Sequence, residues 1–205
     1  MPDVFFAFDL DGTVTTEEIL PRLAERLGLR AEMERLTRRA VQGDDAFAAS
    51  FRARVDMLGD LSPAEAQRVT AATPLDPTIA AFIRERRDCC ALVTGNLDCW
   101  VNPLAENLGC RAFTSTSERK NGRIAVKAIL NKAEAVRELA RNGAKVVAVG
   151  ESAGDIPLFA AADVGIAYAG VHEPAPALLP LARHVARSGE ELCALLRQVE
   201  NELRR

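Results

Sequence analysis

The chain has 205 residues, of which 48% are hydrophobic, and it carries a formal net charge of −3 at pH 7. This length provides enough apolar side chains for one domain, or for a core domain with a modest insertion. The slight acidic excess argues against nucleic acid or an anionic membrane as a main partner, because both attract basic surfaces.

Further features of the sequence narrow the class of protein. No apolar run approaches bilayer length, and the start Met1-Pro2-Asp3 lacks the positive charge of a signal peptide, so we expect a cytoplasmic protein. The five cysteines form no CxxC pair, which predicts reduced thiols. The two histidines, His172 and His184, lie late in the chain and away from any apparent motif, which leaves little support for Ser–His or Cys–His chemistry.

Short apolar runs alternate with helical patterns, which is typical of an α/β fold with a mainly parallel sheet. Most of these runs lack polar alternation, as expected of strands covered on both faces. Asn121-Gly122 predicts a small hairpin. The predicted strands are Val4–Leu10, Ala91–Thr94, Arg111–Thr114, Val146–Gly150, Val164–Ala167 and His184–Ala186.

The connection after the first predicted strand is long and almost wholly helical. A parallel crossover needs only one helix, so the surplus predicts an inserted helical cap. We therefore expect a core of residues 1–14 and 74–205 and a cap of residues 15–73. The helical patterns of this connection cover residues 19–27, Ala31–Val41, Asp44–Leu58 and Ser62–Ala72.

Later helices are expected to begin at capping residues and to end at glycines. The predicted starts are Asp76-Pro77, Asn131 with Glu134, Asp155 before Pro157, and Ser188 with Glu191, and the predicted ends are Gly109 and Asn142-Gly143.

Two carboxylates follow the first predicted strand in the segment Phe8-Asp9-Leu10-Asp11-Gly12-Thr13. Strand alternation places Asp9 and Asp11 on the same side, at the carboxyl edge where open α/β sheets bind ligands. Like charges this close repel each other, and a shared divalent cation would relieve the repulsion. The alternative is a strand that simply ends in a polar turn.

Two weaker signals concern phosphate binding. Thr94 ends the second predicted strand, and its hydroxyl, with the N–H groups that follow, can donate to a phosphoryl oxygen. A β-branched residue at a strand end needs no such function. Lys132 falls in the first turn of a predicted helix, where the macrodipole disfavours a cation unless an anion binds nearby. A solvated lysine is nevertheless tolerated there at modest cost.

A second acidic segment, Gly150-Glu151-Ser152-Ala153-Gly154-Asp155, follows a later predicted strand. Glu151 can complete a metal site, and Asp155 can orient Lys132 or a metal-bound water. Asp155 also fits a plain helix N-cap, and the two roles are compatible.

These four segments, in this order, resemble the haloacid dehalogenase superfamily and, within it, the phosphoserine phosphatases. The resemblance implies a Rossmann-like three-layer core with an inserted α-helical cap of the C1 type. It also implies that Asp9 is the nucleophile, Asp11 the general acid and base, and Thr94 and Lys132 the groups that hold the phosphate. The implied Mg²⁺ ligands are Asp9, Asp11 through its backbone carbonyl, Glu151 and Asp155.

Positions in the predicted cap match the same family. Glu18 stands where these phosphatases carry a glutamate that meets the substrate ammonium, and Arg54 where an arginine meets the carboxylate. One anion and one planar guanidinium suit an amino acid head group. The resemblance also places Phe47 over the site and Gly95 and Asn96 beside the substrate.

Two alternatives remain open for these cap positions. Glu18 has the spacing of a capping box with Thr15, although Pro21 favours a helix start after Glu18 and so argues against that reading. Arg52 could replace Arg54 as the carboxylate contact.

Two motifs depart from the family pattern. The fourth motif usually reads Gly-Asp-Gly-x-Asn-Asp, whereas here Glu151 lengthens the acidic side chain by one methylene and Gly154 removes an amide. The second motif is usually Ser-Gly-Gly and is here Thr94-Gly95-Asn96. These changes bear on substrate specificity more than on phosphatase chemistry.

We therefore expect a Mg²⁺-dependent phosphomonoester hydrolase that acts through an aspartyl-phosphate on phosphoserine or a similar small phosphorylated amino acid. The alternatives are a phosphotransferase, a phosphatase for another small metabolite phosphate, or a non-catalytic phosphometabolite-binding protein. The expected partner is a small phosphorylated metabolite, and the expected state is a monomer or homodimer.

Overall fold

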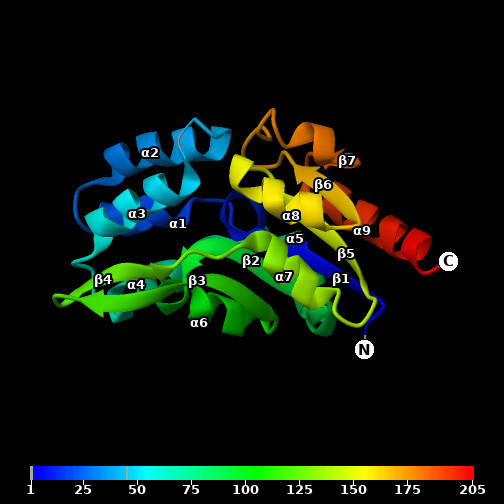
Figure 1. The fold of residues 1–205 in the computed structure, drawn as a ribbon, viewed down its shortest axis with the longest axis horizontal. Coiled ribbons are helices and arrows are strands. Elements are labelled where there is room, and N and C mark those ends of the chain that lie inside the picture. The colour runs from blue at the N-terminus through cyan, green and yellow to red at the C-terminus, as the bar shows by residue number, and fades with distance from the viewer. Residues whose placement is uncertain (1, 45) are drawn as a thin grey trace.

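The computed structural model describes residues 2–44 and 46–205, and within them seven strands form one sheet (Figure 1). The strand order is β4-β3-β2-β1-β5-β6-β7, and β3 and β4 pair antiparallel while the other neighbours pair parallel. The predicted α/β fold is confirmed. The strands are β1 (Val4–Phe8), β2 (Cys90–Leu97), β3 (Arg111–Lys120), β4 (Arg123–Ala128), β5 (Lys145–Gly150), β6 (Val164–Tyr168) and β7 (His184–Ala186).

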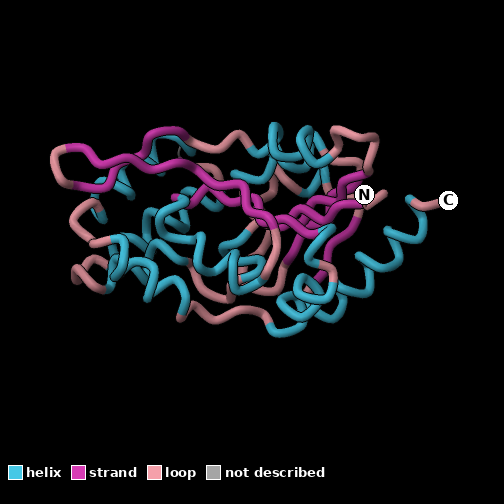
Figure 2. Tube along the Cα trace, turned by 90° about the horizontal axis from the view of Figure 1, so that it is seen from below, coloured by secondary structure: helices cyan, strands magenta, loops and turns pink. Residues whose placement is uncertain are grey.

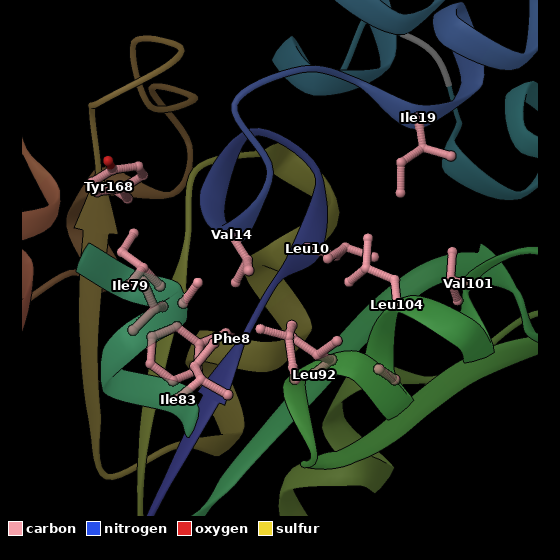
Figure 3. Packing of buried hydrophobic residues seen from close by; sticks show 14 of the residues in the cluster. Phe8, Leu10, Val14, Ile19, Ile79, Ile83, Leu92, Val101, Leu104 and Tyr168 are labelled. Atoms are coloured by element: carbon pink, nitrogen blue, oxygen red, sulfur yellow. The ribbon is translucent and has the colours of Figure 1, made fainter. Parts of the chain in front are cut away.

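Helices cover both faces of the sheet (Figure 2). The helices of the core are α5 (Pro77–Glu85), α6 (Asp98–Leu108), α7 (Lys132–Leu139), α8 (Ile156–Ala161) and α9 (Gly189–Leu203). Alternate side chains of β1 enter two separate hydrophobic clusters, one on each face of the sheet. Phe6 and Phe8 pack in the cluster that includes residues of α5, α6 and α9, and Figure 3 shows Phe8 beside Ile79 and Ile83 of α5. Ala7 enters the other cluster, which includes residues of α7 and α8.

Burial on both faces explains why β1 is apolar throughout. Each large side chain buried in this way contributes about 1.5–3 kcal/mol relative to an exposed one. The strand is therefore held firmly at the centre of the sheet, and the residues that follow it start from a fixed position.

The long connection after β1 is helical, as predicted. Its helices are α1 (Ile19–Glu25), α2 (Arg30–Gln42), α3 (Phe47–Leu58) and α4 (Pro63–Ala71). Figure 1 places α1, α2 and α3 together near the β3–β4 hairpin. Helix α3 contacts β4, and α4 contacts α6 of the core. Position 45 of the predicted helix Asp44–Leu58 lies outside the described residues.

The two ends of this inserted segment lie side by side. Thr15 and Leu75 form an antiparallel bridge. Backbone hydrogen bonds flank the bridge, from Thr16 N to Pro74 O at 2.9 Å and from Asp76 N to Val14 O at 3.0 Å. The chain thus leaves and re-enters the core at one place.

Several boundaries differ from the sequence prediction. β1 ends at Phe8 rather than Leu10, because the chain turns tightly over Leu10–Val14 with Gly12 at a φ of 69°. β3 continues to Lys120, because the predicted hairpin extends its pairing through a turn in which both Asn121 and Gly122 have positive φ. β2 likewise continues beyond the predicted end at Thr94, with a register shift against β3.

Several helix termini follow the local signals, but α7 ends at Leu139, before the predicted end at Asn142-Gly143. Asp76, Asn131 and Ser188 each accept a backbone N–H bond at the predicted start of a helix. Gly109 ends α6 in the left-handed region. Across the described parts of the chain, no helix combines the length and the apolar character that crossing a membrane requires.

Candidate active site

The carboxyl edge of the sheet gathers polar residues from distant parts of the sequence. Asp9 directly follows β1, Glu151 follows β5, and Lys132 begins α7. They share a cavity, called here the central cavity, with side chains of the inserted helices. It is lined by Asp9, Asp11, Glu18, Leu20, Thr37, Ala40, Val41, Phe47, Phe51, Arg54, Thr94, Gly95, Asn96, Lys132, Glu151, Ser152 and Gly154. Asp155 is the one residue predicted for the site that does not line this cavity; its side chain is fully buried.

Lys132 joins two carboxylates inside the protein. Its Nζ lies 2.6 Å from Asp9 Oδ1 and 2.6 Å from Asp155 Oδ1, and its side chain is only 7% exposed. Burial by itself would lower the pKa of Lys132, but the charges of Asp155 and Asp9 outweigh this and raise it. The lysine is therefore a permanent cation, and the carboxylates explain why the first turn of α7 tolerates it.

Three buried carboxylates form a cluster that can hold a metal ion. Ligand atoms of Asp9, Glu151 and Asp155 all lie within 4.8 Å of one another. Burial and the repulsion from Asp155 raise the pKa of Asp9 to about 7 although Lys132 opposes the shift. Burial, with Asp9 and Asp155, raises the pKa of Glu151 well above its usual value. Oxygen donors with excess negative charge fit a hard divalent cation, which would relieve this repulsion.

The side chain of Asp11 has hydrogen-bond partners outside this cluster. Its Oδ1 accepts a hydrogen bond from Ile19 N at 2.7 Å, and its Oδ2 accepts one from the side chain of Asn96. Burial, together with the charges of Glu18 and Asp9, raises the pKa of Asp11 well above its usual value. The side chain of Asp11 is thus not one of the three clustered carboxylates.

Two hydroxyl groups that the sequence reasoning did not single out support the acidic segment. Thr13 Oγ1 donates to Glu151 Oε2 at 2.8 Å. Asp155 Oδ2 accepts from the backbone N–H and the hydroxyl of Ser152, both at 2.9 Å. Asp155 therefore caps its own loop rather than α8, whose start at Ile156 was predicted. The spacing of Ser152 and Asp155 is that of a capping box, which was a usable signal.

The ring of Phe47 covers two glycines of the core. A Cβ at Gly95 would meet Phe47 Cζ at 2.7 Å, and one at Gly154 would lie 3.6 Å from Phe47 Cδ2. Phe47 also stacks on Phe51, with ring centroids 5.7 Å apart. The absence of a side chain at Gly95 therefore leaves room for this ring, whereas a Cβ at position 154 would make only an ordinary van der Waals contact with it.

The structure separates the two candidate arginines of α3. Arg54 is buried and lines the central cavity, where its Nη1 donates to Thr37 Oγ1 at 3.2 Å. Arg52 donates to Val126 O at 3.1 Å and is not among the residues that line the cavity. Of these two, Arg54 is the one placed to meet a bound ligand.

Glu18 lies immediately before α1, as Pro21 suggested, and makes no capping bond through its side chain. Its Oε1 instead lies 3.0 Å from Nε2 of His172, a residue far along the chain. The sequence reasoning missed His172, because no local pattern marks it.

The comparisons with known proteins agree with this geometry. Residues 6–160 match the haloacid dehalogenase-like hydrolases. The phosphoserine phosphatase of Methanocaldococcus jannaschii is 31% identical over 176 residues, which cover 78% of this chain and 83% of that protein. The phosphoserine phosphatase of Archaeoglobus fulgidus is also 31% identical, but this chain covers only 51% of its length.

Solved structures lead to the same family. A substrate-bound phosphoserine phosphatase has a TM-score of 0.80 at 25% identity and covers 97% of this chain and 98% of its own. A phospho-aspartyl intermediate analogue of phosphoserine phosphatase has a TM-score of 0.79 at 26% identity, over 96% of this chain and 98% of its own. With its acidic cluster at the carboxyl edge of the sheet, this chain belongs to the haloacid dehalogenase-like hydrolase family and is a phosphatase.

Proposed function

We propose that the chain is a Mg²⁺-dependent phosphomonoesterase that forms an aspartyl-phosphate on Asp9. The observation that carries this proposal is the position of the Asp9 carboxylate, which is bonded to Lys132, clusters with Glu151 and Asp155, and faces the central cavity. The pKa of Asp9 is raised to about 7 even with Lys132 beside it, so a divalent cation would favour the charged form that attacks phosphorus.

Asp9, Glu151 and the backbone carbonyl of Asp11 would hold the Mg²⁺ ion, with Asp155 beside them. When bound, the ion would neutralise negative charge on the phosphate and on the carboxylates. Its oxygen ligands match the preference of magnesium.

The side chains supply the remaining chemistry. The Asp9 carboxylate attacks phosphorus, the ester P–O bond breaks, and the leaving alkoxide takes a proton from Asp11. The raised pKa of Asp11 favours the protonated form that this step requires. A water molecule then gives a proton to Asp11 and attacks the phosphorus, which releases phosphate and restores Asp9.

Positive charge and hydrogen-bond donors would hold the phosphate oxygens. Lys132 is a cation of the cavity wall that contacts Asp9 directly. Thr94 Oγ1 already accepts from Asn96 N at 3.2 Å, so its own O–H remains a donor for a phosphoryl oxygen. Charge on these oxygens is what a phosphoryl-transfer site must stabilise.

The substrate we propose is phosphoserine or a similar small phosphorylated amino acid. Arg54 and Glu18 line the same cavity with opposite charges, and the relatives described above are phosphoserine phosphatases. We also propose that residues 15–73 act as a cap that excludes water during turnover, with Phe47 resting over Gly95 and Gly154.

A phosphate-release screen over small phosphate monoesters tests the proposal, run once with Mg²⁺ and once with a chelator. We expect turnover only with the metal, and turnover that is unaffected by chelation would contradict the metal assignment. Beryllium fluoride, which mimics an acyl phosphate, should bind Asp9 in the presence of Mg²⁺. Phosphate release without such trapping would contradict the covalent step.

A further inference from the structure

Glu18 of the inserted segment and His172 of the core form an ion pair beside the central cavity. His172 Nε2 lies 3.0 Å from Glu18 Oε1, and the side chains are 36% and 16% exposed. Glu18 lines the central cavity, whereas His172 lines a second, outer cavity to which Glu18, Thr37 and Val41 also contribute. The pair therefore stands between the two cavities.

Packing holds His172 in this place. Its ring lies against Gly12, where a Cβ would meet His172 Cδ2 at 2.9 Å. Gly12 belongs to the turn that carries Asp9 and Asp11. The segment that contains His172 is bonded to the second acidic motif through Ala175 N and Glu151 O at 2.8 Å. Contacts with the core thus hold His172 in position to meet Glu18.

The pair also balances charge. The charge of Glu18 contributes to the raised pKa values of Asp11 and Glu151, for which burial is the larger cause. The hydrogen bond to Glu18 raises the pKa of His172, which favours the imidazolium form. Arg30 lines the outer cavity too, but it pairs with Glu25 and Glu34 at 2.9 and 2.8 Å.

We propose that His172 determines substrate specificity by occupying the carboxylate of Glu18. A substrate ammonium then adds little to binding, and the enzyme also hydrolyses phosphorylated carboxylic acids that lack an amino group. This inference rests on the proposed phosphatase function. It leaves Arg54 as the group that recognises the head of the substrate, through a carboxylate.

The physical reason is competition for one anion. An ammonium that approaches Glu18 must either displace the imidazolium or lie beside it, and like charges repel. Removing the imidazole would leave a partly buried carboxylate without this partner, which would then favour an ammonium. His172 acts through Glu18 and is a positioning residue, so its effect should depend on the ammonium of the substrate.

Two probes isolate this effect, because O-phospho-L-serine and 3-(phosphonooxy)propanoate differ only in the ammonium. For the wild-type enzyme we expect kcat/KM values for the two probes within about threefold of each other. An ion pair between the substrate ammonium and the partly exposed Glu18 would add no more than this factor to binding. His172→Ala should raise the preference for phosphoserine by about fivefold. An equal loss of kcat/KM for both probes in the His172 variant would indicate a structural defect alone and would overturn the proposal.

Control variants separate the contributions. The double variant Glu18→Gln/His172→Ala should lose the gained preference, because the anion that binds the ammonium is gone. His184→Ala, the matched change at the other histidine, should keep the wild-type ratio. A wild-type preference for phosphoserine above about tenfold would overturn the proposal even if the His172 variant failed to fold. Absence of phosphate release from both probes and from p-nitrophenyl phosphate with Mg²⁺ would overturn the proposed function itself.

Discussion

The two sides of the central cavity hold their charged groups differently. On the core side, Lys132 lies 2.6 Å from both Asp9 and Asp155, and all three side chains are at most 8% exposed. On the side of the inserted helices, Glu18 forms a pair with His172 that is partly open to solvent. Both sides contribute charge to one cavity, and the inserted helices also supply the buried Arg54, but the Glu18–His172 pair is more exposed to solvent than the pairs that Lys132 makes.

This difference separates chemistry from selection. In the core network each charge is stabilised by the others, so removing one leaves the rest buried and unbalanced. A change at Arg54 of the inserted helices leaves the bonds of Lys132 with Asp9 and Asp155 in place and alters what the cavity accepts. We expect core variants to lose turnover or stability for every substrate, and variants of the inserted helices to lose it selectively.

The largest effect is expected for Asp9→Asn, which removes the proposed nucleophile and one metal ligand. We expect turnover of every phosphate ester to fall by at least about 10³-fold, as for other nucleophile variants. Phosphate release with Mg²⁺ measures it. Asp60→Asn, the same change at an exposed carboxylate, controls for an unspecific effect of the substitution and should retain full activity. Wild-type turnover by the Asp9 variant would remove Asp9 from the mechanism.

Lys132→Met should destabilise the fold as well as slow the reaction. It leaves Asp9 and Asp155 buried without their cation, and breaking such a pair costs about 3–5 kcal/mol. The free energy of unfolding in urea measures the loss. Lys145→Met breaks a pair with Asp163 in which the lysine is 51% exposed, and the expected loss there is below about 1 kcal/mol. Equal losses in both variants would contradict the comparison between buried and exposed charges.

Arg54→Ala should impair only substrates that carry a carboxylate. Loss of a charge-assisted hydrogen bond costs about 1.5–3 kcal/mol, so we expect KM for phosphoserine to rise by roughly tenfold or more. An aryl phosphate without a carboxylate should be nearly unaffected. Arg52→Ala is the matched control on the same helix and should change neither substrate. Equal effects of Arg54→Ala on both substrates would remove it from recognition.

The smallest effect concerns the metal-free protein and pH. Because burial raises the pKa of Asp9 to about 7, the folded form binds a proton that the unfolded form has released. This contribution to stability is fully present below the ordinary pKa of an aspartate and is lost as the pH rises through the raised pKa of about 7. We expect the free energy of unfolding to fall by about 2 kcal/mol between pH 5.5 and 7.5 with a chelator.

Magnesium should reduce that dependence on pH, because it would stabilise the ionised carboxylates. Urea unfolding at the two pH values, with and without the ion, provides the measurement. If the metal-free protein became more stable between pH 5.5 and 7.5, the raised pKa of Asp9 would be contradicted.

The parts of the fold that depend on local pattern were predictable. Apolar runs marked the strands, and capping residues such as Asp76 and Ser188 marked helix starts, because these signals act over a few residues. The positions of Asp9, Lys132 and Glu151 at one edge followed from their places near strand ends and at a helix start, since parallel strands bring such residues together.

Contacts between distant segments were not predictable. Glu18 and His172 are 154 residues apart in the sequence, and their meeting depends on the packing of the imidazole against Gly12. The family resemblance placed Phe47 over the site, but its contacts with Gly95 and Gly154 depend on how the inserted helices dock on the core. A single sequence records the residues at these places but not the packing that brings them together.

The paired ends of the inserted segment have an evolutionary and practical consequence. Because Thr15 and Leu75 are bridged, the segment between them leaves and returns through neighbouring positions and imposes no stretch on the sheet. Such a junction tolerates exchange of the intervening segment, since insertions at closely spaced ends cost little loop-closure entropy. Evolution or protein engineering could therefore replace the inserted segment, keep the reaction of the core and change the substrates that the enzyme accepts.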